Sequence, residues 1–198
     1  MADPYLLLWL EAPLQAWGHD SKFGRRDTLA FPTKSGVLGL ICCAMGAGGE
    51  QRELLAEFAS LEQTVVSFVR VASDKKQERP PLLRDFHMVG SAYDDQDPWQ
   101  NLLIPKTSEG KKAVGGGAKL TYRYYLQDAC FAVVLQTPLN RVDAVAQALQ
   151  NPTWDLYLGR KNCVPTDFIY RGRFDDAAEA MAHAVEIAKQ KKRMEDFR

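Results

Sequence analysis

The residues best suited to chemistry lie in one loop near the N-terminus. This loop carries Trp17 beside Gly18, the run Phe23-Gly24-Arg25-Arg26, and the run Pro32-Thr33-Lys34-Ser35-Gly36 that opens a helix. Lys and Arg neutralise phosphates, backbone N–H groups at a helix start point towards an anion, and an aromatic ring stacks on a base. The loop therefore indicates that the chain binds a polyanion, which requires no enzymatic step.

Candidate RNA-binding residues extend from this loop to several other polar and basic stretches. A phosphate clamp is favoured for Arg25, Arg26 and Lys34, whereas Trp17 fits base stacking and a core position equally well by residue type. Single-stranded RNA is recognised through stacked bases and contacts to the ribose hydroxyls. The full candidate set is Gln15, Trp17, Lys22, Arg25, Arg26, Lys34, Ser35, Arg84, His87, Lys111, Lys112, Arg123, Arg160, Lys161 and Asn162.

A second hypothesis is a metal-independent endoribonuclease centred on His87. Such cleavage needs a base for the 2′-hydroxyl and an acid for the leaving 5′-oxygen, and His87 with Tyr122 and Lys119 is chemically adequate. The alternative role of His87 is a hydrogen bond within the run Leu83-Arg84-Asp85-Phe86. Lys34-Ser35 lacks the spacing of a Walker motif, so nucleotide hydrolysis is not indicated. We favour the binding function, without catalytic residues.

Composition limits the alternatives. The 198 residues suffice for one large domain or two small ones, and 46% of them are hydrophobic. The formal net charge is zero, so any basic surface must be local. No two of the four cysteines have C-x-x-C spacing, so a zinc site is not indicated and reduced thiols are expected. No cofactor fingerprint is present, so neither a cofactor nor a small-molecule enzyme is indicated. We expect a cytoplasmic protein without membrane contact, since neither a signal peptide nor a spanning segment is indicated.

The hydrophobic pattern predicts a mixed fold. A protruding loop or long hairpin is expected over residues 90–118, which carry little periodicity. The order of elements suits a ferredoxin-like α+β sandwich, with helices on one face of an antiparallel sheet. The predicted strands cover residues 5–10, 64–72, 82–89, 119–126, 129–136 and 168–174. A first helix is predicted after Thr33 or Ser35, either of which can cap it. Further helices are predicted over 50–60, 142–149 and 175–193, with Asn140 as a candidate cap of the second of these three.

Several motifs resemble one protein family. The run Pro13-Leu14-Gln15-Ala16-Trp17-Gly18, followed by Phe31-Pro32-Thr33-Lys34-Ser35-Gly36-Val37-Leu38-Gly39-Leu40, is similar to the N-terminal signature of the CasD family. These proteins are the crRNA 5′-handle subunits of type I-E CRISPR Cascade complexes. Further similar stretches are 83–87, 122–131 and 157–165, so the resemblance runs from about residue 5 to about residue 170.

The resemblance implies a ferredoxin-like (RRM-like) RAMP domain over residues 1–174, with a thumb insertion at about 88–120, followed by a C-terminal helix over 175–198. It implies a non-catalytic subunit that binds and caps the 5′ handle of crRNA. The implied partners are the backbone subunit (CasC-like), the large PAM-recognising subunit (CasA-like) and, through the complex, target DNA. The tail after Phe174 departs from the family pattern, which continues through further strands.

Overall fold

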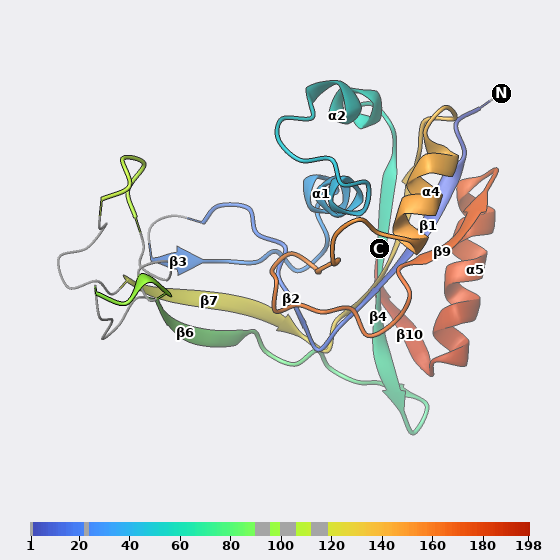
Figure 1. Cartoon of the computed structure of the whole chain (residues 1–198). Coiled ribbons are helices and arrows are strands. Elements are labelled where there is room, and N and C mark those ends of the chain that lie inside the picture. The colour runs from blue at the N-terminus through green and yellow to red at the C-terminus, as the bar shows by residue number, and fades with distance from the viewer. Residues whose placement is uncertain (1, 22–23, 90–95, 100–105, 112–118) are drawn as a thin grey trace.

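The computed structural model describes residues 2–21, 24–89, 96–99, 106–111 and 119–198 (Figure 1). Two sheets and four named helices form in these parts of the chain. The elements follow the order β1 (Tyr5–Glu11), β2 (Leu14–Gln15), β3 (Arg25–Arg26), α1 (Lys34–Ala44), α2 (Arg52–Phe58), β4 (Gln63–Ala72), β5 (Lys75–Lys76), β6 (Leu83–Val89), β7 (Lys119–Gln127), β8 (Cys130–Gln136), α4 (Val142–Gln150), β9 (Tyr170–Phe174), α5 (Ala177–Gln190) and β10 (Arg193–Phe197).

The main sheet has the strand order β10-β4-β8-β1-β9, and all of these neighbours are antiparallel. The short β5 pairs with the end of β4. β1 and β8 lie in the middle of the sheet, and the continuous apolar run of β1 is buried on both faces, as the sequence predicted.

Helices cover both faces of this sheet. On one face α1, α2 and α4 pack against alternate residues of β1, among them Leu6, Leu8 and Leu10. On the other face α5 packs its small side chains, such as Ala180 and Ala184, against a layer that includes Leu7 and Trp9. The expectation of helices on one face, which left out the C-terminal tail, therefore holds for α1, α2 and α4, whereas the tail helix α5 covers the other face. Small alanine side chains let α5 lie close to the second face, which would otherwise expose apolar residues.

The chain ends in a strand rather than in the helix predicted for residues 175–193. Asp176 caps α5 by accepting hydrogen bonds from the backbone N–H groups of Ala178 and Glu179. After Gln190 the chain turns through Lys192, whose φ is 54°, and β10 then pairs antiparallel with β4. Five of the eight residues from Lys191 to Arg198 are Lys, Arg or Asp and one is Glu, without the alternation of a strand, so the local pattern favours the end of a charged helix.

The second sheet is built on a hairpin of β6 and β7. The other edge of β7 pairs with β2 in antiparallel and with β3 in parallel orientation. This sheet projects from the main sheet as an arm (Figure 1), and β7 leads into β8 through a turn at Asp128, whose φ is 52°. Most of the predicted insertion at 88–120 lies outside the described residues.

Helices α1 and α4 begin with different kinds of cap residue. Thr33 caps α1, as the sequence predicted, because its hydroxyl accepts a hydrogen bond from the N–H of Gly36. The cap of α4 is Arg141, without a side-chain hydrogen bond, and not Asn140. Among the described residues, none of the helices has the length and apolar character needed to cross a bilayer.

Candidate nucleic-acid interface

One face of the projecting hairpin combines exposed aromatic and basic side chains. Successive side chains of a strand point to opposite faces, so every second residue of β6 and β7 shares one face. The register pairs Arg84 with Tyr124, Phe86 with Tyr122, and Met88 with Leu120. We call this surface the arginine–aromatic face; its members are Arg25, Arg84, Phe86, Met88, Leu120, Tyr122 and Tyr124.

Direct ring contacts hold this face together. The ring centroids of Phe86 and Tyr122 are 5.4 Å apart, and the Arg84 guanidinium lies 5.5 Å from the Tyr122 ring centroid. Phe86 is 56% and Tyr122 45% exposed. Apolar rings on a projecting arm that stay accessible to solvent provide surfaces on which unpaired bases stack.

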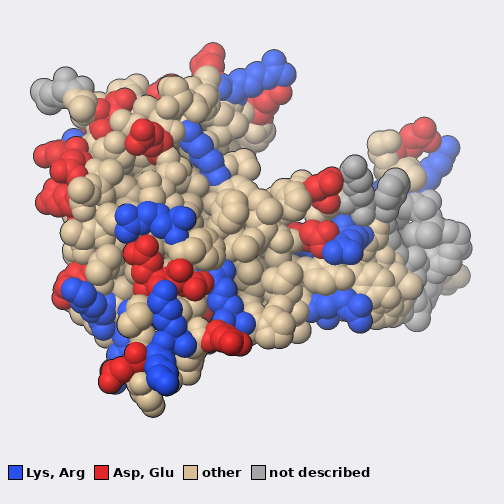
Figure 2. Space-filling view, turned by 180° about the vertical axis from the view of Figure 1, so that it is seen from behind, with Lys and Arg blue, Asp and Glu red and all other residues tan. Residues whose placement is uncertain are grey.

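The face carries two arginines, and Asp27 offsets the charge of one of them, Arg25. Arg25 extends from β3 over Tyr124, with its guanidinium carbon 5.0 Å from the ring centroid. Its Nε donates to both carboxylate oxygens of Asp27, at 2.9 and 2.8 Å, and these hydrogen bonds raise the pKa of Arg25. Figure 2 shows basic side chains on the projecting arm, beside acidic ones. The arm can therefore contact a phosphate backbone and stack bases at the same time.

Two residues of the predicted N-terminal site lie in the core instead. Trp17 is 2% exposed, and its Nε1 donates to Gln15 Oε1 at 3.0 Å. The Gln15 amide in turn donates to the backbone oxygens of Leu10 and Ala129. The polar atoms of both side chains are thus engaged within the fold, which favours the core position for Trp17 over base stacking. Gly36 explains the burial of Trp17, since a Cβ there would lie 2.9 Å from the indole.

Lys34 and Arg160 also serve the fold. Lys34 Nζ donates to the carbonyl oxygens of Ala59 and Leu61, just after α2, at 3.1 and 2.6 Å. Arg160 donates to the backbone oxygens of Tyr124 and Arg26, at 3.1 and 2.9 Å. These bonds engage both cations with backbone carbonyls, so the fold already uses the two side chains predicted to clamp phosphate. A basic side chain in a loop satisfies buried carbonyls as readily as it binds phosphate.

The remaining candidates lie in different places. Ser35, Lys161 and Asn162 are exposed, but on α1 and on the 158–163 turn rather than on the arginine–aromatic face. Arg26 is half-buried and pairs in register with Arg123, whereas Arg25 pairs with Tyr122, so the two arginines lie on opposite faces. Lys111 pairs with Glu109 at 3.1 Å. Lys22 and Lys112 lie outside the described residues.

The candidate catalytic residues do not converge. His87 pairs in register with Thr121, so it lies on the face opposite to Tyr122. Its Nδ1 lies 3.6 Å from a carboxylate oxygen of Asp85, so its nearest charged neighbour is in the run 83–86, where the sequence analysis placed its alternative role. Arg123 lies on the face of His87 and donates to the Thr121 hydroxyl. His87 and Tyr122 therefore point to opposite faces of the arm, and of Lys119 only the backbone is described.

The cysteines match the expected reduced thiols. All four are free, with Cys130 and Cys163 buried and Cys42 and Cys43 half-buried. Burial raises the pKa of Cys130 and of Cys163, which keeps these thiols protonated. Within the described ranges, no three His, Cys, Asp or Glu side chains group so that they could hold a metal ion.

The chain matches the family model for CRISPR-associated protein (Cas5) over residues 5–196. It belongs to the Cas5 family. This Cas5 chain is 30% identical over 171 residues to "CRISPR system Cascade subunit CasD" of Escherichia coli (strain K12), a match that covers 85% of the chain and 70% of the relative. The resemblance to CasD is thereby confirmed.

Solved structures agree with this assignment. The Cas5 chain is similar to a chain of a "CRISPR RNA-guided surveillance complex", with 30% identity, a TM-score of 0.69, and coverage of 91% of this chain and 67% of that one. A second similar structure is described as a Cas protein, with 31% identity, a TM-score of 0.55, and coverage of 90% and 69%. The mixed α+β fold is therefore that of Cas5 proteins.

Three members of the arginine–aromatic face of this Cas5 chain, Phe86, Met88 and Tyr124, were not predicted from the sequence as RNA-binding candidates. The signal was present, because Arg84, Phe86 and Met88 stand at every second position and face a strand rich in tyrosine. Alternation of this kind usually indicates the buried side of a strand. Here the exposed side of an arm carries it, so only the placement of the strands identifies these residues as accessible.

Proposed function

We propose that this Cas5 chain is the non-catalytic RNA-binding subunit of a type I-E CRISPR Cascade complex, in which it binds and caps the 5′ handle of the crRNA. In the same proposal it acts in the cytoplasm and contacts a CasC-like backbone subunit and a large CasA-like subunit that recognises the PAM. Through the assembled complex it contributes to interference with target DNA.

The topology supports the RAMP part of this proposal. Taken in chain order, β1, α1, β4, β8, α4 and β9 form a βαββαβ unit, whose four strands lie in the order β4-β8-β1-β9. This order and the antiparallel pairing are those of a ferredoxin-like fold. The β6–β7 hairpin leaves this unit between its second and third strands, and the thumb proposed for residues 88–120 would lie at the far end of this hairpin.

The arginine–aromatic face is the observation that carries the RNA-binding part. Two arginines lie over tyrosine rings, and an exposed phenylalanine packs beside them on an arm that projects from the body. A face of this composition binds unpaired nucleotides through stacking and phosphate contacts, with little need for a deep pocket. We infer that the handle lies along this arm.

The test measures binding of the full chain to a fluorescent RNA that carries the 5′ handle. Base stacking on an aromatic side chain contributes ~1–3 kcal/mol, so Tyr122→Ala should weaken binding by roughly 5- to 150-fold. Arg84→Ala should weaken it and also reduce its dependence on salt. The matched control is Arg52→Ala, which removes an exposed arginine of α2 that pairs with Glu50. This control should bind as the unchanged protein does.

Two results would contradict the proposal. Equal affinity of Tyr122→Ala, Arg84→Ala and Arg52→Ala would remove the arginine–aromatic face from RNA binding. Cleavage of repeat RNA by the chain in EDTA, abolished by His87→Ala, would establish the endoribonuclease instead of the binding subunit.

A further inference from the structure

Arg79 lies at the root of the projecting arm and contacts several distant segments. It belongs to the connection between β5 and β6. Its Nη1 donates to the backbone oxygen of Ala30, in the loop before α1, at 3.3 Å, and its Nη2 donates to Ser67 Oγ of β4. The guanidinium thus joins the start of the arm to one face of the main sheet.

The strongest of these contacts reach the C-terminal strand. Arg79 Nε donates to Asp196 Oδ2 at 2.6 Å, and both side chains are about 70% buried. The guanidinium carbon also lies 4.3 Å from the centroid of the Phe197 ring. A partly buried ion pair with a cation–π contact holds a side chain more firmly than either alone at an exposed site. Asp196 and Phe197 of β10 therefore hold the Arg79 side chain in place.

The link from Arg79 to the arm is stiff. Pro80 and Pro81 follow directly, and β6 begins at Leu83. Proline fixes φ, so two prolines in succession leave little rotational freedom between the anchor and the strand. Gln127 at the end of β7 adds a second tie, because its Nε2 donates to the Pro81 carbonyl oxygen at 2.8 Å. Arg79 thus lies at the β6 end of the arm, whose other strand, β7, continues through Asp128 into β8.

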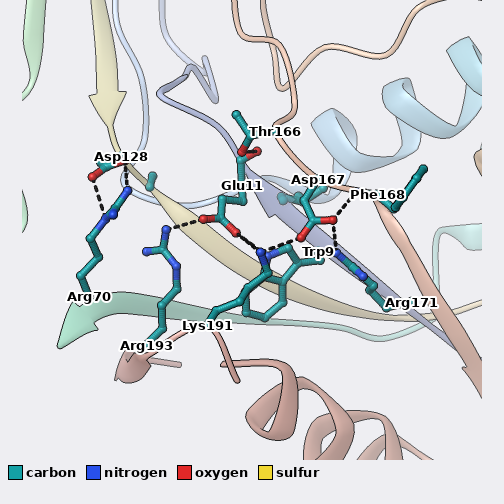
Figure 3. Close-up of polar contacts among 12 residues, drawn as sticks. Trp9, Glu11, Arg70, Asp128, Thr166, Asp167, Phe168, Arg171, Lys191 and Arg193 are labelled. Atoms are coloured by element: carbon teal, nitrogen blue, oxygen red, sulfur yellow. Dashed lines mark hydrogen bonds and ion pairs between the residues drawn. The ribbon is translucent and has the colours of Figure 1, made fainter. Parts of the chain in front are cut away.

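The strand β10, which carries Asp196 and Phe197, is itself held at its other end. Figure 3 shows Arg193 and Lys191 reaching Glu11, which also accepts a hydrogen bond from Trp9 Nε1. Lys191 bonds to Asp167 as well, at 2.6 Å. These contacts tie the beginning of β10 to the centre of the main sheet, and the pairing of β10 with β4 continues, through a bulge between Glu195 and Phe197, to the residues that contact Arg79.

We propose that Arg79 is a positioning residue: seated on Asp196 and Phe197 of β10, it sets the direction of the β6–β7 arm and thereby of its RNA-binding face. The inference rests on the proposed function for its consequence in RNA binding, but not for its structural part. The C-terminal strand then acts on RNA binding without touching RNA.

The structural part is tested by the distance between two spin labels, one at Met88→Cys on the arm and one at Gln147→Cys on α4, with Cys42 and Cys43 replaced by alanine. Met88 and Gln147 are both exposed. We expect one narrow distance distribution in the parent protein and a broader or displaced one after Arg79→Ala, Asp196→Asn or Phe197→Leu. The matched control is Arg173→Ala, which breaks the Arg173–Asp143 pair on the main body and should leave the distribution unchanged.

RNA affinity separates this inference from the proposed function. Arg79→Ala should weaken handle binding about five- to tenfold, because a loosened arm is less preorganised. Unchanged distance distributions in Asp196→Asn and Phe197→Leu would overturn the inference, and these two variants decide the matter if Arg79→Ala does not fold. A broadened distribution without loss of affinity, while Tyr122→Ala still binds weakly, would overturn its link to RNA. If neither Tyr122→Ala nor Arg79→Ala weakens binding, the proposed function fails, and a broadened distribution still supports the positioning role.

Discussion

Replacement of Glu11 is the sharpest test of what holds the C-terminal strand in place. The Glu11 carboxylate accepts a hydrogen bond from Trp9 Nε1 at 2.9 Å and one from Arg193 Nη2 at 2.5 Å, and it lies 3.2 Å from Lys191 Nζ (Figure 3). The Arg193 side chain is only 3% exposed. Glu11→Ala therefore leaves a buried guanidinium without its acidic partner.

The expected loss follows from that burial. Removal of one partner from a buried ion pair costs about 3–5 kcal/mol, because the remaining charge stays desolvated and uncompensated. For a chain of this size, 1 kcal/mol shifts the midpoint of thermal unfolding by roughly 2–4 °C, so the midpoint should fall by roughly 6–20 °C. The double variant Glu11→Gln/Arg193→Met removes both charges and should recover most of the lost stability.

The measurement is denaturant and thermal unfolding of the two variants beside Glu50→Ala. Glu50 forms a pair with Arg52 in which both side chains are largely exposed, and its loss should change the free energy of unfolding by less than about 0.5 kcal/mol. A Glu11→Ala variant as stable as Glu50→Ala would refute the reasoning. A double variant no more stable than Glu11→Ala would refute it as well.

Two further predictions concern pH and helix α1. Burial opposes ionisation of Glu11 and Asp167, but hydrogen bonds from Trp9 to Glu11 and from Lys191 to Asp167 contribute to a net lowering of the pKa of both. Their contribution to stability is therefore complete above their ordinary pKa values and is lost as the pH falls through the lower folded values; unfolding at pH 6, 4 and 3 checks this, and stability independent of pH over that range would contradict it. In α1, Gly36→Ala should lower the free energy of unfolding by about 1–3 kcal/mol, because the added Cβ would lie 2.9 Å from the indole of Trp17. Gly39→Ala should raise it by about 0.5–1 kcal/mol, because a Cβ at that position would have no atom within 4 Å. Thermal unfolding of the pair tests this, and equal midpoints would count against it.

Most of the main sheet could be predicted from the sequence because its central strands are unusual. β1 and β8 are continuous apolar runs with buried neighbours on both sides, and such runs are strong signals even without an alignment. The end of the chain gave no such signal. The strand Arg193–Phe197 is defined by its pairing with β4. Burial of Arg193 is possible because the carboxylate of Glu11, 182 residues away in the sequence, compensates its charge. Long-range ion pairs of this kind cannot be inferred from local pattern.

The sequence shows which residue types could bind RNA, but not which of them the fold itself engages. Trp17 and Lys34 both contact the fold, because the N-terminal loop packs against α1 and the chain after α2. Residue type alone does not distinguish a Lys or Arg that donates to backbone carbonyls from one that is available to bind phosphate. The accessible rings, Phe86 and Tyr122, became evident only once the hairpin was placed as a projecting arm.

The most direct test of the account is photo-crosslinking in the assembled complex, with crRNA that carries 4-thiouridine in its 5′ handle, followed by identification of the crosslinked peptides. The account predicts crosslinks to peptides from the β6–β7 arm, over residues 83–89 and 119–127, and their loss in the Tyr122→Ala variant. Handle crosslinks confined to peptides of the main body, with none on the arm, would contradict the claim that the arginine–aromatic face binds the guide RNA.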